Sequence, residues 1–249
     1  MMPVKMVDCH CHLDQYKDPL AIIKDPKGKN TFIIAVTNLP SHFKVGLMHT
    51  RPFTNIRISL GFHPLTAAKN VKQLELFENY VNETSFIGEI GLDFSKEGIA
   101  TKDDQIKIFT RIAQALSNTS PKIISVHSRG AEQQLLEIVD KYKLKNIILH
   151  WFTGPNDALQ QALSLGCFFS INPKMTITTK GKSTIEAIPF NRILTESDGP
   201  YAKIFNRMAM PWDASIVIKY LSETWQQPID VVKEQVWNNF INLTKSLTK

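Results

Sequence analysis

Residues 4–13, VKMVDCHCHL, decide how this chain is interpreted. A short apolar run leads into Asp8, His10 and His12, which are spaced two residues apart. Successive side chains of a β-strand point to opposite faces, so a strand here places these three side chains on one face. Neutral imidazole is the commonest metal ligand in proteins. The stretch therefore predicts a buried strand that ends in a metal-binding group, whereas the alternative is one histidine that ends the strand and another that faces water.

Apolar and β-branched runs recur along the chain and alternate with amphipathic segments. We expect further strands at 31–37, 55–61, 86–91, 122–127, 146–150, 167–171 and 192–195, and helices at 15–24, 41–50, 71–82, 102–116, 131–142, 156–165, 183–187, 213–225 and 229–247. Each intervening helix would connect two parallel strands, which predicts an α/β protein whose sheet is buried on both faces. For residues 1–249 we favour a single domain, a closed (β/α)8 TIM-type barrel, over an open doubly wound sheet.

The composition excludes several classes of protein. Hydrophobic residues make up 43% and charged residues 21% of the chain, which is typical of a globular protein and not of a disordered one. No window supplies the apolar run of about 20 residues that a membrane-spanning helix needs, so no membrane association is expected. The N-terminus does not resemble a secretory signal. Cys9, Cys11 and Cys167 lack zinc-knuckle or redox spacing, so we expect buried thiols in a reducing, cytoplasmic compartment.

The charge balance favours an anionic partner without identifying it. The formal net charge is +6, but the lysines are scattered and form no basic tail of the kind that binds nucleic acid. Any recognition of an anion must therefore come from a folded cleft.

Residues that commonly bind metals recur at the ends of the expected strands. His63 follows the third strand, Glu89 lies in the fourth, His127 and His150 end the fifth and sixth, and Asp198 follows the eighth. In a barrel these strand ends converge on one mouth, where active sites of this fold lie. A lone histidine at a strand end is more often a hydrogen-bonding residue, but a whole set at the same rim is unlikely to arise by accident. The sequence therefore predicts one shared site.

The chemistry of this set favours hydrolysis. Two histidines with a terminal aspartate suit one divalent ion, two further histidines suit a second, and the two oxygens of Glu89 can bridge both. Paired ions about 3.5–4 Å apart stabilise the attacking and leaving oxygens of a displacement and generate hydroxide near neutral pH. Asp198 could also take the proton from the attacking water. We therefore predict Glu89 and Asp198 as the catalytic residues.

Six motifs span residues 8–201 in the order DCHCHLD, GFHP, GEIGLDF, VHSR, HWFTG and ESDGPY. This series resembles the TatD family of metal-dependent deoxyribonucleases, within the amidohydrolase-like barrels of metal-dependent hydrolases. The resemblance implies hydrolysis of phosphodiesters in DNA, from an end or in single strands, with two divalent ions such as Mg, Mn or Zn. The metal ligands that it implies are His10, His12, Glu89, His127, His150 and Asp198.

The resemblance also suggests roles for residues around the ligands. His63 and Arg129 would face substrate phosphate, although a solvated cation is the alternative for Arg129. Asp93 would support the ligands from outside the set, and Asp8, deeper in the barrel, would orient a histidine ligand. Trp151 would either pack in the core or stack on a base.

Several details are similar to one subgroup. HCHLDQYKDP, HWF with its tryptophan, ESDGP and MPWD at 210–213 resemble QatD, the TatD-like component of the bacterial Qat anti-phage system. This resemblance implies partner proteins encoded alongside, including an ATPase and a deazaguanine-synthase-like protein, and a role in defence against phage.

Two other interpretations stay open. The same site could serve an amidohydrolase or esterase that acts on a small molecule, because a fold does not determine its substrate. Alternatively, the chain could be a non-catalytic binding subunit of a Qat-type defence complex, although the presence of all six ligand-type residues argues against this. Binding of single-strand DNA that weakens steeply with salt would favour the nuclease.

Overall fold

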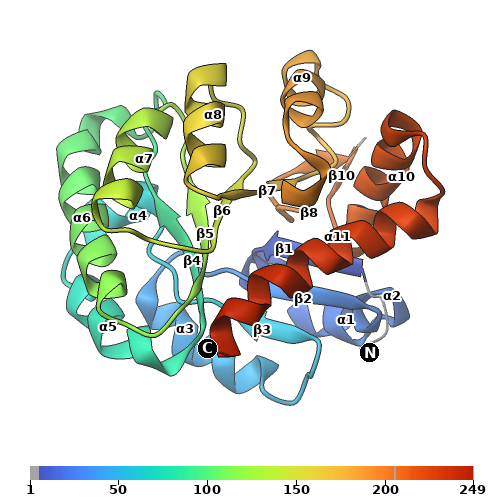
Figure 1. Cartoon of the computed structure of the whole chain (residues 1–249). Coiled ribbons are helices and arrows are strands. Elements are labelled where there is room, and N and C mark those ends of the chain that lie inside the picture. Colours follow the sequence, from blue (N-terminus) through green and yellow to red (C-terminus); the bar gives the residue numbers. More distant parts are fainter. Residues whose placement is uncertain (1–5, 205, 249) are drawn as a thin grey trace.

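The computed structural model describes residues 6–204 and 206–248, in which parallel strands alternate with helices (Figure 1). The strands are β1 Met6–Cys11, β2 Thr31–Ala35, β3 Ile56–Ile58, β4 Phe86–Gly91, β5 Ile123–His127, β6 Ile147–His150, β7 Phe168–Ile171, β8 Ile193–Thr195, and the short β9 Lys203–Ile204 and β10 Arg207–Met208. Val4, part of the first apolar run in the sequence, lies outside the described residues. The predicted strands therefore all form, most of them shorter by one to four residues than expected.

The helices occupy the connections that the sequence predicts for them. They are α1 Pro19–Lys24, α2 Pro26–Lys29, α3 Pro40–Thr50, α4 Pro64–Ala67, α5 Gln73–Tyr80, α6 Lys102–Ser117, α7 Glu132–Lys141, α8 Asn156–Ser164, α9 Thr179–Ala187, α10 Ala214–Trp225 and α11 Ile229–Thr244. Short 3-10 turns extend several of them. Helix α5 and the 3-10 turn Val81–Glu83 fill the region 71–82, in which one helix was expected, whereas α4 and the 3-10 turn Ala68–Asn70 lie before it and were not predicted.

Hydrogen bonds close the strands into a barrel. Strands β1, β2 and β3 form one parallel sheet and β4 to β8 another, each in sequence order. The two sheets join where Leu60 N donates to Phe86 O at 3.0 Å and Gly88 N donates to Leu60 O at 2.9 Å. The other junction lies between the loop after β8 and β1, where Asp198 N donates to His10 O at 2.9 Å. The prediction of a (β/α)8 barrel is therefore confirmed.

Helix α11 covers the barrel beside β1 and β8 (Figure 1). Its Val236 and Phe240 are buried, and the ring of Phe240 lies 5.1 Å from that of Phe32 on β2. These contacts cover the outer faces of β1 and β2. Strands that are apolar along nearly their whole length need such cover on both faces of the sheet. Cys9 and Cys11 of β1 are also buried, as free thiols, in agreement with their expected role as small hydrophobic side chains.

Helix α3 shows why local patterns place helix ends poorly. The sequence favours a start at Ser41 with a serine cap, but the helix begins at Pro40 after Leu39. Proline suits the first helical position, because a backbone N–H there would have no partner within the helix and proline has no N–H. The N–H of Ser41 instead donates to Oε1 of Gln73 at 3.0 Å.

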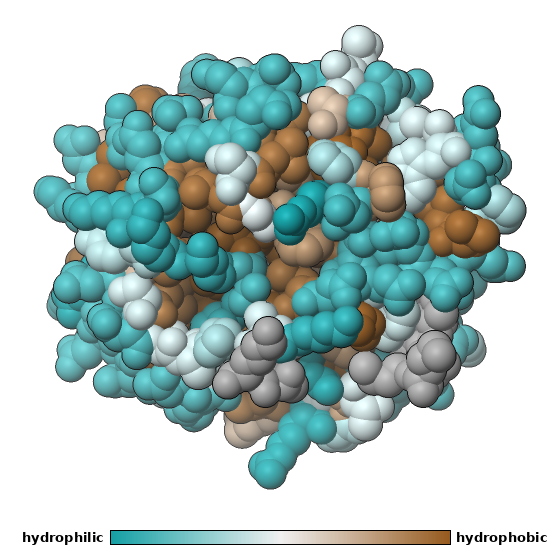
Figure 2. Space-filling model, viewed as in Figure 1, coloured by the Kyte–Doolittle hydropathy of each residue, from teal (hydrophilic) through white to brown (hydrophobic). Residues whose placement is uncertain are grey.

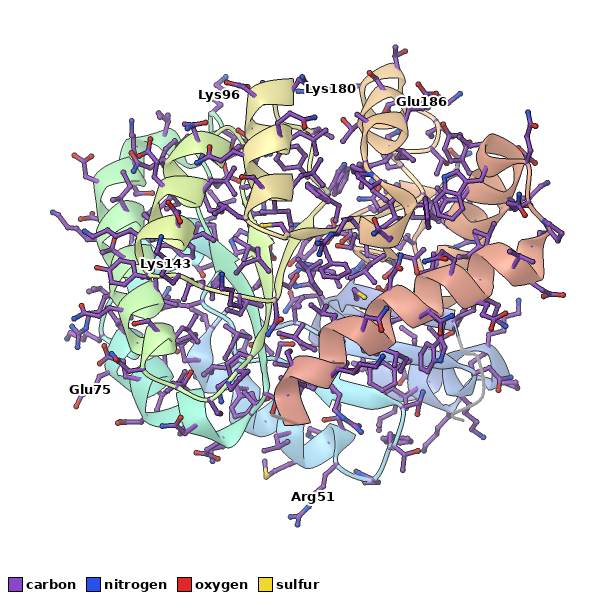
Figure 3. All side chains as sticks on the ribbon, viewed as in Figure 1. Arg51, Glu75, Lys96, Lys143, Lys180 and Glu186 are labelled. Atoms are coloured by element: carbon purple, nitrogen blue, oxygen red, sulfur yellow. The ribbon has the colours of Figure 1, made fainter. Side chains whose placement is uncertain are left out.

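The viewed face of the molecule is hydrophilic around its outline, with hydrophobic side chains toward its middle (Figure 2). Charged side chains at the periphery, among them Arg51, Lys96 and Glu186, point away from the ribbon (Figure 3). Among the described residues, none of the helices has the length and apolar character to cross a membrane.

Candidate functional site

The predicted ligand residues meet at the carboxyl ends of the barrel strands. His10 and His12 are near or just after the end of β1, Glu89 lies on β4, and His127 ends β5. His150 and Asp198, at the ends of β6 and β8, complete the group. They surround a cavity of about 630 Å³ lined by His12, Asn38, His63, Leu65, Thr66, Glu89, Asp93, His127, Ser128, Arg129, Glu132, His150, Trp151, Thr153, Asp198 and Tyr201.

Glu89 lies at the centre of this group. Its Oε2 lies 3.2 Å from Nε2 of His12 and 3.5 Å from Nε2 of His10. Its Oε1 lies 2.7 Å from Nδ1 of His127 and 2.9 Å from Nε2 of His150. The two oxygens of one buried carboxylate therefore face two separate pairs of imidazole nitrogens.

Asp198 lies close to the two histidines of the first strand, His10 and His12. The Nε2 atoms of the two histidines are 3.3 Å apart, and Oδ1 of Asp198 lies 3.9 and 3.7 Å from them. Two imidazole ligands of one tetrahedral zinc ion, each bound at about 2.0–2.1 Å, would be about 3.3–3.4 Å apart. The donor atoms are therefore spaced as ligands of a single ion would be.

The second half adjoins the first. Nδ1 of His127 lies 3.2 Å from Nε2 of His150, and the ring of His150 stacks on that of His10 at 3.9 Å with an interplanar angle of 10°. The donor atoms of His63, Glu89 and His127 also lie within 4.8 Å of one another. Imidazole and carboxylate together suit divalent metal ions, so the residues present fit a metal centre.

Partners behind the histidines determine which ring nitrogen faces Glu89. Nε2 of His127 lies 2.8 Å from Oδ2 of Asp93, and Nδ1 of His10 lies 2.7 Å from Oγ of Ser125. Burial opposes ionisation of Asp93, but hydrogen bonds from His127 and Ser95 lower its pKa to about 2. His127 therefore meets Asp93 with one ring nitrogen and Glu89 with the other.

Glycine allows β4 to approach β5 at this point. Gly91 has a φ of 138°, and a Cβ built on it would lie 2.0 Å from the carbonyl oxygen of His127. A side chain at this position would displace the strand that carries His127, so Gly91 is required for the spacing between Glu89 and its histidines.

Asp8 is fully buried and contacts the backbone rather than an imidazole ring. Its Oδ1 accepts hydrogen bonds from His10 N at 3.2 Å and Ser197 N at 2.9 Å, and its Oδ2 accepts one from Ser197 Oγ at 2.6 Å. Burial raises the pKa of this carboxyl group. Asp8 therefore ties β1 to the loop that carries Asp198.

Sequence reasoning missed Glu196, although it lies within the ESDGPY motif. Its Oε1 accepts hydrogen bonds from Trp151 N at 3.1 Å and Asn172 Nδ2 at 3.0 Å, and its Oε2 accepts one from Ser170 Oγ. The same Oε1 lies 3.6 Å from Nδ1 of His150. Glu196 is fully buried, and its carboxyl group lies directly behind His150.

His63 presents a neutral hydrogen-bond donor to the cavity. Its Nδ1 accepts the N–H of Leu65 at 3.2 Å, which leaves the proton of the neutral ring on Nε2. That Nε2 lies 3.5 Å from Oε2 of Glu89, and burial lowers the pKa of His63 to about 4. Arg129 also lines the cavity, but its side chain is 65% exposed, with Nη1 3.8 Å from Oε2 of Glu97.

Trp151 was considered either as a core residue or as a surface on which a base could stack, and its position has features of both. It lines the cavity, and it also packs against the small buried cluster of Ala202, Ile204 and Ala209. Its φ of 41° lies in the left-handed region, which is uncommon for a bulky residue. The hydrogen bond from its N–H to Glu196 holds the backbone in this conformation.

The electrostatics of the cluster favour cation binding. Burial opposes ionisation of Glu89, but His63, His150 and His10 hold its pKa well below the usual range. Burial raises the pKa of Asp198 to about 7, although His150 and His12 oppose this shift. Three carboxylates, those of Glu89, Asp198 and Glu196, thus share one buried region, and metal ions would compensate their charge.

Comparison with solved structures supports the barrel. The structure superimposes on YJJV, a TatD homolog from Escherichia coli, with a TM-score of 0.79 and 22% identity, covering 98% of each chain. An uncharacterized amidohydrolase from Saccharomyces cerevisiae matches with a TM-score of 0.80 and 15% identity, over 97% of this chain and 100% of the other.

Sequence relatives extend over nearly the whole chain. Deoxyribonuclease TATDN3 of Homo sapiens is 26% identical over 267 residues, covering 98% of this chain and 96% of the relative. An uncharacterized metal-dependent hydrolase of Methanocaldococcus jannaschii is 26% identical over 247 residues and 96% of each chain. A family model described as TatD related DNase matches residues 7–245, so the chain belongs to the TatD-related DNase family and is a metal-dependent hydrolase that acts on ester bonds.

Proposed function

We propose that this protein is a deoxyribonuclease that hydrolyses phosphodiester bonds in single strands or at DNA ends, with two divalent ions in its site. One observation carries the proposal: the two oxygens of Glu89 face two separate pairs of imidazole nitrogens, at 3.2 and 3.5 Å on one side and 2.7 and 2.9 Å on the other. Membership in the TatD-related DNase family supports DNA as the substrate. We further propose that residues 1–249 act as one catalytic unit.

The proposed ligands divide between the two halves of the site. His10, His12 and Asp198 would hold one ion, His127 and His150 the other, and Glu89 both. When bound, two such ions supply positive charge to the reacting phosphate and make water acidic enough to ionise near neutral pH. The donor set is compatible with Mg, Mn or Zn.

The side chains of the cavity provide the rest of the proposed chemistry. His63 donates from Nε2 to a phosphate oxygen, and Arg129 provides a cation for the same phosphate or the next one. Asp198 accepts the proton of the attacking water at a carboxylate oxygen. Trp151, which lines the same cavity, offers a surface on which a base can stack.

The proposal is tested by the metal content of the purified protein together with cleavage of end-labelled DNA. We expect two equivalents of divalent metal per chain and stepwise shortening of single-strand DNA. The same preparation after removal of metal by a chelator is the control, and activity should return when metal is added back. Absence of cleavage of single- and double-strand DNA by the metal-loaded protein would contradict the proposal.

A small-molecule ester or amide is the second candidate substrate, because a cavity of about 630 Å³ has the size of a small-molecule pocket. The salt dependence of DNA binding separates the two. If several phosphates are bound in and around the cavity, affinity for single-strand DNA falls steeply between about 50 and 200 mM salt. Absent or salt-independent binding would favour the small molecule.

The role in anti-phage defence, the Qat partner proteins and the cytoplasmic location are also part of the proposal. The defence role and the partner proteins rest on the subgroup motifs, of which MPWD contributes Asp213; its carboxylate binds both Nη atoms of Arg207 at 2.6 and 2.8 Å. The cytoplasmic location rests on the number and spacing of the cysteines. Phage plating on cells that carry the complete system, with and without this chain, tests the defence role.

Replacing Glu196 with glutamine is expected to remove the carboxyl group behind the His150 ring while leaving every proposed metal ligand in place. The carboxylate accepts hydrogen bonds from Trp151, Asn172 and Ser170, and an amide would place its own donor against one of these donors. A buried donor without a partner costs about 1–3 kcal/mol, so the free energy of unfolding of the metal-free protein should fall by that amount. Loss of a partner behind a ligand histidine commonly lowers metal affinity about 10–100-fold. Urea denaturation and competition with a chelator measure the two effects.

Glu186→Gln is the matched control for this substitution. Glu186 lies on α9 and its side chain points away from the ribbon (Figure 3), so both quantities should stay at the wild-type values. Wild-type metal affinity in Glu196→Gln would show that His150 needs no support from this carboxylate.

A further inference from the structure

One wall of the cavity carries neutral polar and aromatic side chains. Asn38, Leu65, Thr66 and Tyr201 line it, and they lie beside His12 and His63. The charged lining residue Arg129 belongs instead to the strand end beside His127. A nucleotide has a charged phosphate and an uncharged base, and an uncharged wall suits the base better than the phosphate.

Tyr201 offers this wall an aromatic surface. Its ring lies 4.8 Å from that of His12 in a T-shaped contact with an interplanar angle of 83°. The residue is nevertheless 53% exposed, so much of the ring remains available to a ligand. Stacking on exposed aromatic rings is the usual way in which proteins hold the bases of single strands.

Asn38 is held firmly by its backbone but weakly by its side chain. Its carbonyl oxygen accepts hydrogen bonds from His63 N at 2.9 Å and Thr66 Oγ1 at 3.1 Å. Its Nδ2 makes one long contact, 3.4 Å to the hydroxyl of Tyr201, and its Oδ1 is buried with no hydrogen-bond partner among the described residues. Exchanging the amide oxygen and nitrogen would still leave one of them without a partner.

An amide with unused hydrogen-bonding capacity at a cavity wall needs an explanation, because buried polar atoms in folded proteins are nearly always paired. The side-chain amide offers one acceptor and two donors. The edge of a nucleobase presents the complementary pattern, and asparagine commonly binds bases in this way. A small rotation of the amide away from Tyr201 would direct it to such a partner.

We propose that Tyr201 and Asn38 form a nucleobase subsite beside the metal centre, in which Tyr201 stacks on the base of a nucleotide at the cleaved bond and Asn38 hydrogen-bonds to its edge. This subsite rests on the proposed nuclease function and adds to it, because it makes the enzyme sensitive to the base as well as to the phosphate. The phosphate itself is left to His63, Arg129 and the metal centre.

The test compares two single-strand substrates of equal length, an oligodeoxyadenylate and an oligomer of tetrahydrofuran abasic nucleotides. They carry the same phosphates and differ only in their bases. We expect the wild-type kcat/KM to be about tenfold or more higher for the oligodeoxyadenylate, the range that stacking and one or two hydrogen bonds provide. In Tyr201→Ala this ratio should fall about fivefold or more, to the part that Asn38 and Trp151 still provide, and in Asn38→Ala it should fall about threefold.

Two further variants separate the subsite from a general effect on the cavity. Tyr201→Phe keeps the ring and should keep most of the ratio. Asn79→Ala, on an exposed position of α5, should leave the ratio at the wild-type value. Metal content of each variant shows that the neighbouring centre is intact.

Three outcomes would overturn the subsite. The wild-type enzyme could cleave both oligomers equally well, or the Tyr201 and Asn38 variants could lose activity on both by the same factor. In either case the nuclease function stands and the subsite falls. Absence of cleavage of any DNA by the wild-type enzyme would instead overturn the nuclease function, and the subsite with it.

Discussion

Replacing Glu89 with glutamine is expected to leave the protein with at most one equivalent of divalent metal and to lower kcat/KM on DNA by about a thousandfold or more. The carboxylate is 2% exposed and lies within 3.5 Å of nitrogens from five histidines, His10, His12, His63, His127 and His150. Glutamine has nearly the same shape, but it offers one oxygen where the proposal requires two. Its amide group also carries no negative charge to offset two divalent ions. Metal analysis and steady-state kinetics measure both effects.

Glu132→Gln is the matched control for metal content. Glu132 is another carboxylate that lines the same cavity, but its oxygen accepts a backbone hydrogen bond from Gly130 at 3.3 Å and contacts none of the ligand histidines. It should retain the full complement of metal. Retention of two equivalents in Glu89→Gln would show that this residue does not bridge the two halves of the site.

The strand ends were the most predictable part of the site. Runs such as IISVH and IILH combine a buried strand with a histidine at its carboxyl end, so the sequence itself places His127 and His150 at the rim of a barrel. Residues spaced two apart on β1 likewise share a face. These features depend only on the period of a strand and the direction of parallel strands.

The contacts behind the ligands were not predictable in the same way. Glu196 meets Ser170, Asn172 and the backbone of Trp151 because three neighbouring strands have a particular register. A single sequence contains no signal for register between strands whose contacting residues lie 24 to 45 positions apart, as these do. The same reason explains Asp8, which was expected to orient a histidine ligand and which accepts hydrogen bonds from the backbone N–H of His10 and from backbone and side-chain groups of Ser197.

Closure of the barrel was predicted correctly, but the irregular junction between β3 and β4 was not. Strands β3 and β4 join through hydrogen bonds of Leu60 with the backbone around Ile87 rather than through a full ladder. Strand β3 was expected to run to residue 61 but ends at Ile58. Gly61 follows, and a Cβ on it would lie 1.6 Å from the carbonyl oxygen of Thr37, so close packing of backbone replaces regular pairing there.

Replacing Asp198 with asparagine is expected to lower kcat on DNA by about 10²–10⁴-fold while much of the metal is retained. Asp198 is 4% exposed, its φ is 46°, and its Oδ1 lies 3.7 Å from Nε2 of His12. Asparagine tolerates the same left-handed backbone and still offers an oxygen as a ligand, so the loop should keep its conformation. It has no carboxylate with which to accept a proton. The loss should therefore appear in kcat much more than in metal content or in KM.

This substitution also distinguishes an enzyme from a binding subunit. Asp157→Asn, which makes the same chemical change on the exposed side of α8, should retain wild-type kcat and metal content. If the protein acts by catalysis, Asp198→Asn should lose both hydrolysis in vitro and the biological activity of the complete system, while circular dichroism shows a folded protein. If the biological activity survives when hydrolysis is lost, the site serves binding, because a group that only positions or binds a partner does not need to accept a proton. The comparison depends on asparagine being nearly isosteric with aspartate at a buried position, so a change of charge and proton affinity is tested without a change of volume.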